Sequence, residues 1–120
     1  MTIPPVQRDK LFLLKPGFED PAYSGKRFYC WHCALLEGVL ASFPSLAARL
    51  DVERVAWPRP RAAVIDILGE ENQSLPLLVL AGEASTGIKV SSCNGVGFIA
   101  GKNEILKALS VRHGFPEPHP

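Results

Sequence analysis

The residues best suited to chemistry in this sequence of 120 amino acids are Cys30 and Cys33, which are separated by Trp31 and His32. Two thiols at this spacing can close a disulfide or grip a metal ion. A structural zinc site normally takes four ligands, often from two such pairs. The sequence offers one further cysteine, Cys93, and three histidines, none of them in a second pair. The spacing therefore favours a redox dithiol, and a metal site or two inert cysteines remain as alternatives.

The residues around this pair predict a strand followed by a helix. Residues 9–14 include a short apolar run, and apolar side chains recur at helical spacing from Cys30 to about Phe43. Cys30 then stands at the helix N-terminus, where the helix dipole stabilises an anion by about 0.3–2 kcal/mol. We expect Cys30 to be the attacking thiolate, stabilised also by His32 when that side chain is protonated. Cys33 lies one turn further along the helix, where it can resolve a mixed disulfide.

The remaining pattern predicts an α/β domain over residues 9–113. Further strands are expected at residues 52–57, 76–80 and 88–92, and further helices at residues 60–68 and 102–112. This β-α-β-α-β-β-α order predicts a four-stranded mixed sheet with helices on both faces. We expect loose ends at residues 1–8 and in the proline-rich tail, residues 114–120, and a long functional or poorly ordered loop at residues 15–29.

Composition restricts the classes of partner. Hydrophobic residues make up 47% and charged residues 21% of the chain, and the formal net charge is +1. These values are ordinary for a globular domain and give no reason to expect a nucleic-acid or membrane partner. No apolar stretch has the length of a membrane span, and the N-terminus lacks the pattern of a secretory signal. We therefore expect a cytoplasmic protein, whose thiols are kept reduced.

A dithiol at a strand-to-helix junction, in this order of elements, resembles the thioredoxin superfamily and most closely its glutaredoxin branch. The segment Ser74–Leu77 resembles the place where that superfamily puts a cis-proline opposite the cysteine pair. The resemblance implies that Pro76 is cis and that the Leu75 backbone pairs with an incoming cysteinyl peptide. It implies a thiol-disulfide oxidoreductase that acts on glutathione or a protein disulfide and requires no cofactor. A histidine at the position of His32 is typical of the oxidants and isomerases of the superfamily.

Two further segments resemble glutathione-binding segments of glutaredoxins. Residues 99–105, at the start of the predicted last helix, resemble the segment whose backbone N–H groups bind the γ-glutamyl carboxylate. Asn103 and Glu104 are therefore candidate glutathione contacts, with helix capping as the alternative role. Lys15 resembles the lysine that faces the glycyl carboxylate. Trp31 is a candidate to cover an apolar substrate surface, or else to pack. The chain is also similar to a small bacterial family of uncharacterised thioredoxin-like proteins.

Two other functions stay open at this point. In the first, a module of the same fold binds zinc or an iron–sulfur cluster through Cys30 and Cys33, across a dimer. In the second, a thioredoxin-fold protein binds partners without redox turnover. Three other features are expected to be structural: Cys93 as a buried and inert thiol, residues 57–61 as a solvated turn, and His113 as a helix C-terminal residue.

Overall fold

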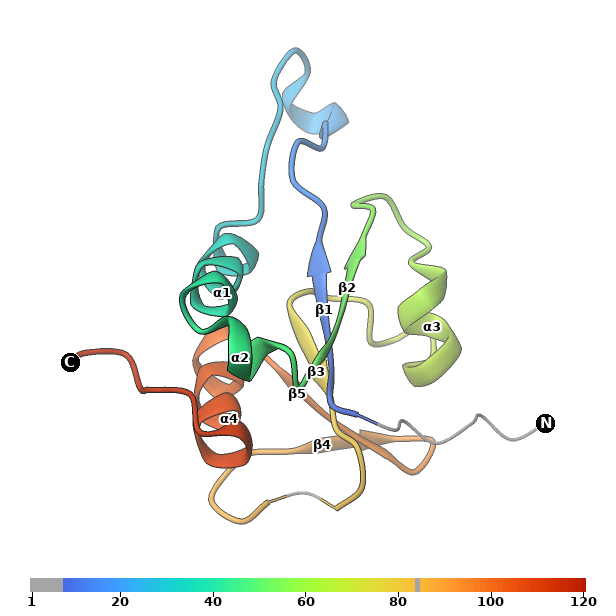
Figure 1. Cartoon of the computed structure of the whole chain (residues 1–120). Helices are drawn as coiled ribbons and strands as arrows, with labels where there is room; N and C mark the ends of the chain where they lie inside the picture. The colour runs from blue at the N-terminus through green and yellow to red at the C-terminus, as the bar shows by residue number, and fades with distance from the viewer. Residues whose placement is uncertain (1–7, 84) are drawn as a thin grey trace.

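The computed structural model describes residues 8–83 and 85–120, which form one five-stranded sheet with helices on both faces (Figure 1). The strands are β1 (Lys10–Leu14), β2 (Asp51–Val55), β3 (Leu77–Val79), β4 (Ser91–Cys93) and β5 (Val96–Ala100). The helices are α1 (Trp31–Ser42), α2 (Pro44–Ala47), α3 (Ala62–Leu68) and α4 (Lys102–His113), with a short 3-10 helix, η1 (Pro21–Tyr23). The described chain is thus a mixed α/β fold, as expected.

The sheet differs from the prediction in its number of strands. Its order is β2-β1-β3-β5-β4, with β1 and β2 parallel and the other neighbours antiparallel. The prediction of four strands is wrong because residues 88–100 contain a hairpin rather than one strand at residues 88–92. Asn94 and Gly95, with φ angles of 54° and 76°, form its two-residue turn. Both angles are positive, as a tight hairpin turn requires, and Asn-Gly is a preferred pair there.

The centre of the sheet is β1, whose side chains alternate between two cores. Leu11 and Leu13 point into the core under α1 and α4, and Phe12 points into the core under α3 (Figure 1). All three are 0% exposed. The helix side chains that cover them are Leu36 and Leu40 of α1, Ile105, Ala108 and Leu109 of α4, and Val64 and Leu68 of α3. Burial on both faces explains why the strand is an unbroken apolar run.

The two ends of the chain were expected to be loose. Residues 1–7 of the predicted N-terminal segment lie outside the described residues. The guanidinium of Arg8 donates to the backbone oxygens of Ala48 and Arg49. At the other end, residues 114–120 contain no helix or strand, yet Phe115 is 2% exposed and its ring meets that of Phe43 edge-on. The start of the tail is therefore anchored in the core, which the sequence prediction did not foresee.

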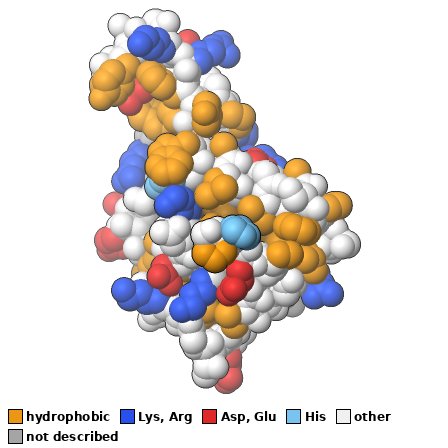
Figure 2. Space-filling model, turned by 90° about the vertical axis from the view of Figure 1, so that its left-hand side faces the viewer, with side chains coloured by type: hydrophobic (Ala, Val, Ile, Leu, Met, Phe, Trp, Pro, Cys, Tyr) orange, Lys and Arg blue, Asp and Glu red, His pale blue; other side chains and the backbone are white. Residues whose placement is uncertain are grey.

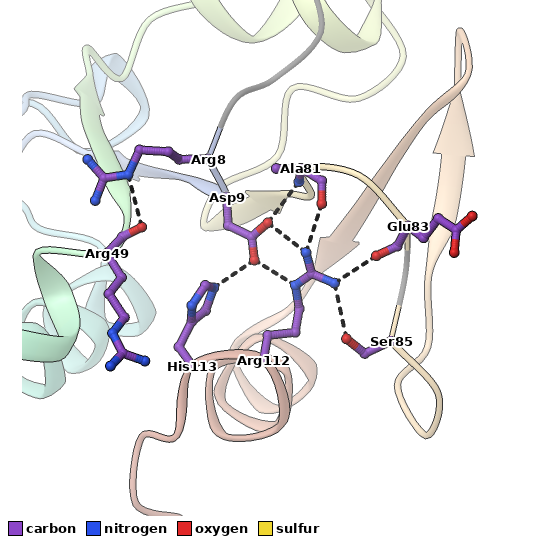
Figure 3. A network of polar contacts seen from close by, with 8 residues as sticks. All are labelled: Arg8, Asp9, Arg49, Ala81, Glu83, Ser85, Arg112 and His113. Atoms are coloured by element: carbon purple, nitrogen blue, oxygen red, sulfur yellow. Dashed lines mark hydrogen bonds and ion pairs between the residues drawn. The ribbon is translucent and has the colours of Figure 1, made fainter.

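A buried charge network joins the beginning of β1 to the end of α4 (Figure 3). The carboxylate of Asp9 accepts two hydrogen bonds from Arg112, at 2.6 and 2.8 Å, and one from the Ala81 N–H at 2.7 Å. His113 Nε2 lies 2.7 Å from the same carboxylate. Burial by itself raises the pKa of Asp9, but these hydrogen bonds and the charge of Arg112 outweigh it, so the pKa is lowered. The network fixes the end of α4 against the sheet.

None of the helices in residues 8–83 and 85–120 is long and apolar enough to cross a membrane.

Candidate functional site at the start of α1

Cys30 is the N-cap of α1, which confirms its expected place at the helix start. Its backbone is extended, and its Sγ accepts a hydrogen bond from the Cys33 N–H at 3.3 Å. A thiol therefore stands where serine or aspartate usually accepts the first free N–H groups of a helix. The side chain is partly exposed. The helix dipole and this N–H both favour a negative charge on the Cys30 sulfur.

Cys33 has the opposite environment. It is 2% exposed, and its Sγ accepts a hydrogen bond from the Leu14 N–H at 3.4 Å. Burial raises the pKa of Cys33 to about 12, helped by the hydrogen bond and charge of Cys30 and by the charge of Glu37, whereas the Leu14 N–H lowers it. Cys33 is therefore a neutral thiol at physiological pH. The two sulfurs differ as a nucleophile and a resolving thiol should differ.

Glu37 is an acidic neighbour of the dithiol that the sequence analysis missed. It lies on α1 one turn after Cys33, and both side chains line the same cavity. Arg54 of β2 holds its carboxylate in a bidentate pair, with bonds of 2.7 and 2.8 Å. The i to i+4 spacing from Cys33 is visible in the sequence, but the pairing across elements is not.

Arg61 is a buried cation near the dithiol, and the expectation of a solvated turn at residues 57–61 is wrong for this residue. It is 7% exposed, and its guanidinium donates to the backbone oxygens of Trp57, at 2.6 and 3.0 Å, and Gln73, at 2.7 Å. Burial and the charge of Arg59 lower the pKa of Arg61, while the charges of Cys33 and Cys30 oppose this shift. The guanidinium therefore lies within electrostatic range of both sulfurs.

The two residues between the cysteines lie on the surface beside the start of α4. Trp31 is 64% exposed, and its ring contacts that of His32 at 3.9 Å between centroids. Lys102 Nζ lies 5.4 Å from the centre of the Trp31 ring. Of the candidate glutathione contacts, Asn103 is exposed and Glu104 half-buried, both in the first turn of α4. The structure thus brings the start of α4 next to the dithiol turn.

Leu75 and Pro76 lie at the same end of the sheet as the cysteines. The Leu75–Pro76 peptide bond is cis, which confirms that expectation, and Pro76 is buried. The sheet register pairs Leu77 with Phe12, so the two preceding residues run beside the end of β1. Leu14, at that end, is the residue whose N–H contacts Cys33.

Residues 15–29, which we call the arm, form a defined projection (Figure 1). The arm contains η1, and a two-way backbone pairing between Phe18 and Phe28, with N–O distances of 3.1 and 2.8 Å, closes it. The Phe18 ring stacks on Trp57 at 5.4 Å, with 6° between the planes. Lys15, predicted to face a glutathione carboxylate, is exposed at the base of the arm and donates its N–H to the Val55 oxygen at 2.9 Å.

A cavity of about 690 Å³ opens between the arm and α1. Both cysteines line it, together with Leu14 at the end of β1. The arm contributes half of the lining, including the aromatic rings of Phe28 and Tyr29. The sequence does not indicate this cavity, because the cavity forms only when the arm folds. Contacts of the arm with β2 and with Trp57 hold the arm beside α1.

The metal alternative can be compared with the ligands present. In residues 8–83 and 85–120, no three Cys, His, Asp or Glu side chains gather into a group able to hold a metal ion. A tetrahedral zinc ion takes four ligands. Cys30 and Cys33 provide two of them, so this alternative needs ligands from a second copy of the chain.

Fold and site together define an α/β protein with a Cys-X-X-Cys dithiol at the start of its first long helix. The chain belongs to DUF3088, a family described as protein of unknown function, whose profile matches residues 8–117. No curated protein and no solved structure matched the chain. The family match spans the sheet, the dithiol and the arm, and it assigns no activity to any of them.

Proposed function

We propose that this protein is a thiol-disulfide oxidoreductase of thioredoxin-like fold, with Cys30 as nucleophile and Cys33 as resolving thiol. The observation that carries the proposal is the inequality of the two thiols. Cys30 is partly exposed and accepts an N–H bond at a helix start, whereas Cys33 is enclosed and its pKa is raised to about 12. The fold supports it too: with the short helices η1 and α2 and strand β4 set aside, the elements keep the β-α-β-α-β-β-α order on which the resemblance rests.

The proposed reaction begins with attack of the Cys30 thiolate on one sulfur of a substrate disulfide. That S–S bond breaks, the second substrate sulfur leaves as a thiolate, and a mixed disulfide to Cys30 remains. Cys33 then loses its proton and attacks the Cys30 sulfur, which releases the first substrate sulfur. The substrate gains two electrons, and the protein is left with a Cys30–Cys33 disulfide. The reverse sequence oxidises a substrate dithiol.

Glutathione or a protein disulfide is the proposed substrate, with no metal required. His32 and the N-terminus of α1 stabilise the thiolate of Cys30. Leu75 and Pro76 shape the opposite side of the site. Lys15, Asn103 and Glu104 are the proposed glutathione contacts, of which the two α4 residues follow Lys102, the side chain that lies over Trp31.

The test is the reduction potential of the dithiol in a glutathione buffer. A potential near about −270 mV indicates a reductant, and one near about −120 mV an oxidant. We expect Cys33→Ser to trap a mixed disulfide and Cys30→Ser to abolish the reaction. Cys93→Ser is the matched control, since the Cys93 thiol, which is half-buried and not buried as expected, donates to the Leu68 oxygen at 3.0 Å and packs against the core on the α3 side.

Two results would contradict the proposal. Stoichiometric metal that is lost on Cys30→Ser would support the metal-binding module instead. A dithiol that neither glutathione disulfide nor a disulfide-linked peptide oxidises would support partner binding without turnover.

A further inference from the structure

We propose that the cavity between the arm and α1 binds a segment of a partner protein that carries a disulfide-bonded cysteine next to an apolar side chain, with an acidic residue close by. This inference rests on the proposed redox function of Cys30 and names its substrate class. The arm, which the sequence analysis left as a long loop, is then the element that selects the partner.

The cavity is placed so that its occupant meets the reacting sulfur. Cys30 and Cys33 line one wall, and a volume of about 690 Å³ lies in the range of sites that enclose a ligand or an inserted side chain. A segment that lies in this space therefore presents its own sulfur to Cys30.

The part of the cavity wall that the arm provides is largely apolar and already formed. Pro16, Phe28 and Tyr29 of the arm line the cavity together with Leu14 and Ala34. Phe28 is held by the ring of Phe18 at 6.3 Å and by that of Tyr23 at 5.9 Å, and Phe18 in turn stacks on Trp57. Figure 2 shows hydrophobic side chains over the arm and over the body next to it. A wall that is ordered before binding lowers the entropic cost of association.

The charges at the cavity favour an acidic partner. Arg27 lines the cavity, and it makes no ion pair or side-chain hydrogen bond with any residue of the described chain. The one acid in the lining, Glu37, is compensated by its bidentate pair with Arg54. The uncompensated charge is therefore positive, which complements a carboxylate on the incoming segment.

A protein segment fits this combination better than glutathione does. Glutathione offers two carboxylates and no apolar side chain, so it leaves the aromatic wall in contact with water. An extended segment places an apolar side chain and an acidic one on either side of its cysteine, within reach of Tyr29 and Arg27. Apolar contact then contributes binding, and the charged contact contributes orientation.

The reaction with such a segment is a reduction of its disulfide. The Cys30 thiolate bonds to the partner cysteine in the cavity, and the other partner sulfur leaves as a thiolate. Cys33 gives up its proton, attacks the Cys30 sulfur and releases the segment as a thiol after protonation. The partner disulfide is reduced by two electrons, and the protein's dithiol becomes a disulfide.

The experiment measures single-turnover oxidation of the reduced protein by three probes. The first is a disulfide-linked peptide with leucine before the cysteine and aspartate after it. The second has glycine and lysine at these places, and the third is glutathione disulfide. We expect the first peptide to react at least about tenfold faster than the second. Equal rates for the two peptides would overturn the proposal.

Two variants of arm residues that line the cavity, with one control outside it, then test the cavity itself. Tyr29→Ser, in the cavity wall, is expected to lower the ratio of the first peptide's rate to that of glutathione disulfide by at least about tenfold. Val111→Ser is the control, because Val111 is an apolar residue of α4 that is 49% exposed and lies outside the lining. Arg27→Glu is expected to reverse the preference between aspartate and lysine peptides. A ratio unchanged in Tyr29→Ser would overturn the proposal.

A failure of the redox proposal gives a different result. If glutathione disulfide and both peptides leave the dithiol reduced, the redox function is contradicted. Calorimetry with the first peptide, its cysteine replaced by serine, then tests the cavity alone. If the native protein binds this peptide and Tyr29→Ser weakens the binding at least about tenfold, the cavity is supported as the binding site. If the native protein does not bind the peptide, the proposal is overturned.

Discussion

The polar groups at the two ends of β1 differ in burial and in their number of hydrogen-bond partners. At the beginning, Asp9 is 3% exposed, and Arg112, His113 and the Ala81 N–H contact its carboxylate. At the end of the strand, each of the two thiols accepts one backbone N–H, from Cys33 or from Leu14, beside an open cavity. At the beginning of β1, which we call the saturated end, both oxygens of the Asp9 carboxylate have hydrogen-bond partners, and these contacts stabilise the fold. At the end of β1, which we call the reactive end, the Cys30 sulfur accepts one hydrogen bond and stays partly exposed, as a reactive thiol requires.

The largest effect is expected at the saturated end. Asp9→Asn removes the charge that compensates Arg112, whose side chain is only 11% exposed. An uncompensated buried charge costs roughly 3–5 kcal/mol. We expect the free energy of unfolding, measured by urea denaturation, to fall by this amount. Asp51→Asn is the control: its pair with Arg8 is exposed and contributes at most about 1 kcal/mol. Equal losses in the two variants would contradict a structural role for the network.

The same end should respond to acid. Because the pKa of Asp9 is lowered from 3.8 in the folded protein, its ionised form stabilises the fold above that value. This contribution is lost as the pH falls through the lowered pKa. The difference in unfolding free energy between the native chain and Asp9→Asn, measured by urea denaturation, should therefore shrink as the pH falls below 3.8.

The next effect concerns the reactive end. At pH 7 we expect iodoacetamide to alkylate Cys30 at least about 100-fold faster than Cys33, because only a thiolate reacts and Cys33 is largely protonated. Mass spectrometry of the digested protein gives the two rates. Above pH 9, the Cys33 rate should rise by about tenfold per unit of pH until its pKa. Equal labelling at pH 7 would remove the distinction between nucleophile and resolving thiol.

Arg61 joins electrostatics and packing at the reactive end. Arg61→Gln leaves carbonyl oxygens of Trp57 and Gln73 without their donor, and we expect a loss of about 1–3 kcal/mol in stability. We also expect mixed-disulfide formation by Cys30 to slow, because a positive charge that interacts with both sulfurs is removed. Arg61→Lys keeps the charge and loses the forked geometry. Recovery of the rate without recovery of stability would separate the two contributions, and an unchanged rate in both variants would limit Arg61 to packing.

The smallest effect is expected for Glu37→Gln. The Glu37–Arg54 pair lies at the surface, with side chains 34% and 47% exposed, so its loss should cost at most about 1 kcal/mol of stability. Because the charge of Glu37 raises the pKa of Cys33, its removal should lower that pKa. Cys33 should then be alkylated a few times faster above pH 9, by roughly the factor expected for loss of one nearby charge. No change in this rate would show that Arg54 screens Glu37 fully.

The sequence contained the local features of the site. The helix that begins after Cys30 follows from apolar periodicity and from the position of the cysteine pair, and both are properties of adjacent residues. The proline at the start of β3 was also readable. The hairpin of β4 and β5 was missed because Gly97 interrupts the apolar pattern, although Asn94-Gly95 is a turn signal that strand patterns alone do not use.

The rest of the site depends on contacts between distant residues. In the sequence, an arginine in a proline-rich segment is typical of an exposed turn. In the structure, Gln73, 12 positions later, supplies acceptors that allow Arg61 to be buried. In the sequence, the arm has the composition of a loop; the contact that joins it to the domain, Phe18 on Trp57, is between residues far apart in the chain. The cavity exists only where these long-range pairs are made, so no local pattern could have predicted it.

The arm also has a consequence for how this family can diversify. The chain leaves the domain at Gly17 and returns at Phe28, and the Gly17 N–H donates to the Phe28 oxygen at 2.8 Å. Backbone hydrogen bonds of Gly17 and Phe18 with Phe28 thus hold its start and end together, and residues 19–27 can change in length or composition without altering the connection of β1 to α1. Because the backbone closes in this way, the outer part of the arm can be replaced without a change in the rest of the fold. The recognition and the sulfur chemistry that we propose can then evolve, or be engineered, on separate parts of one small domain.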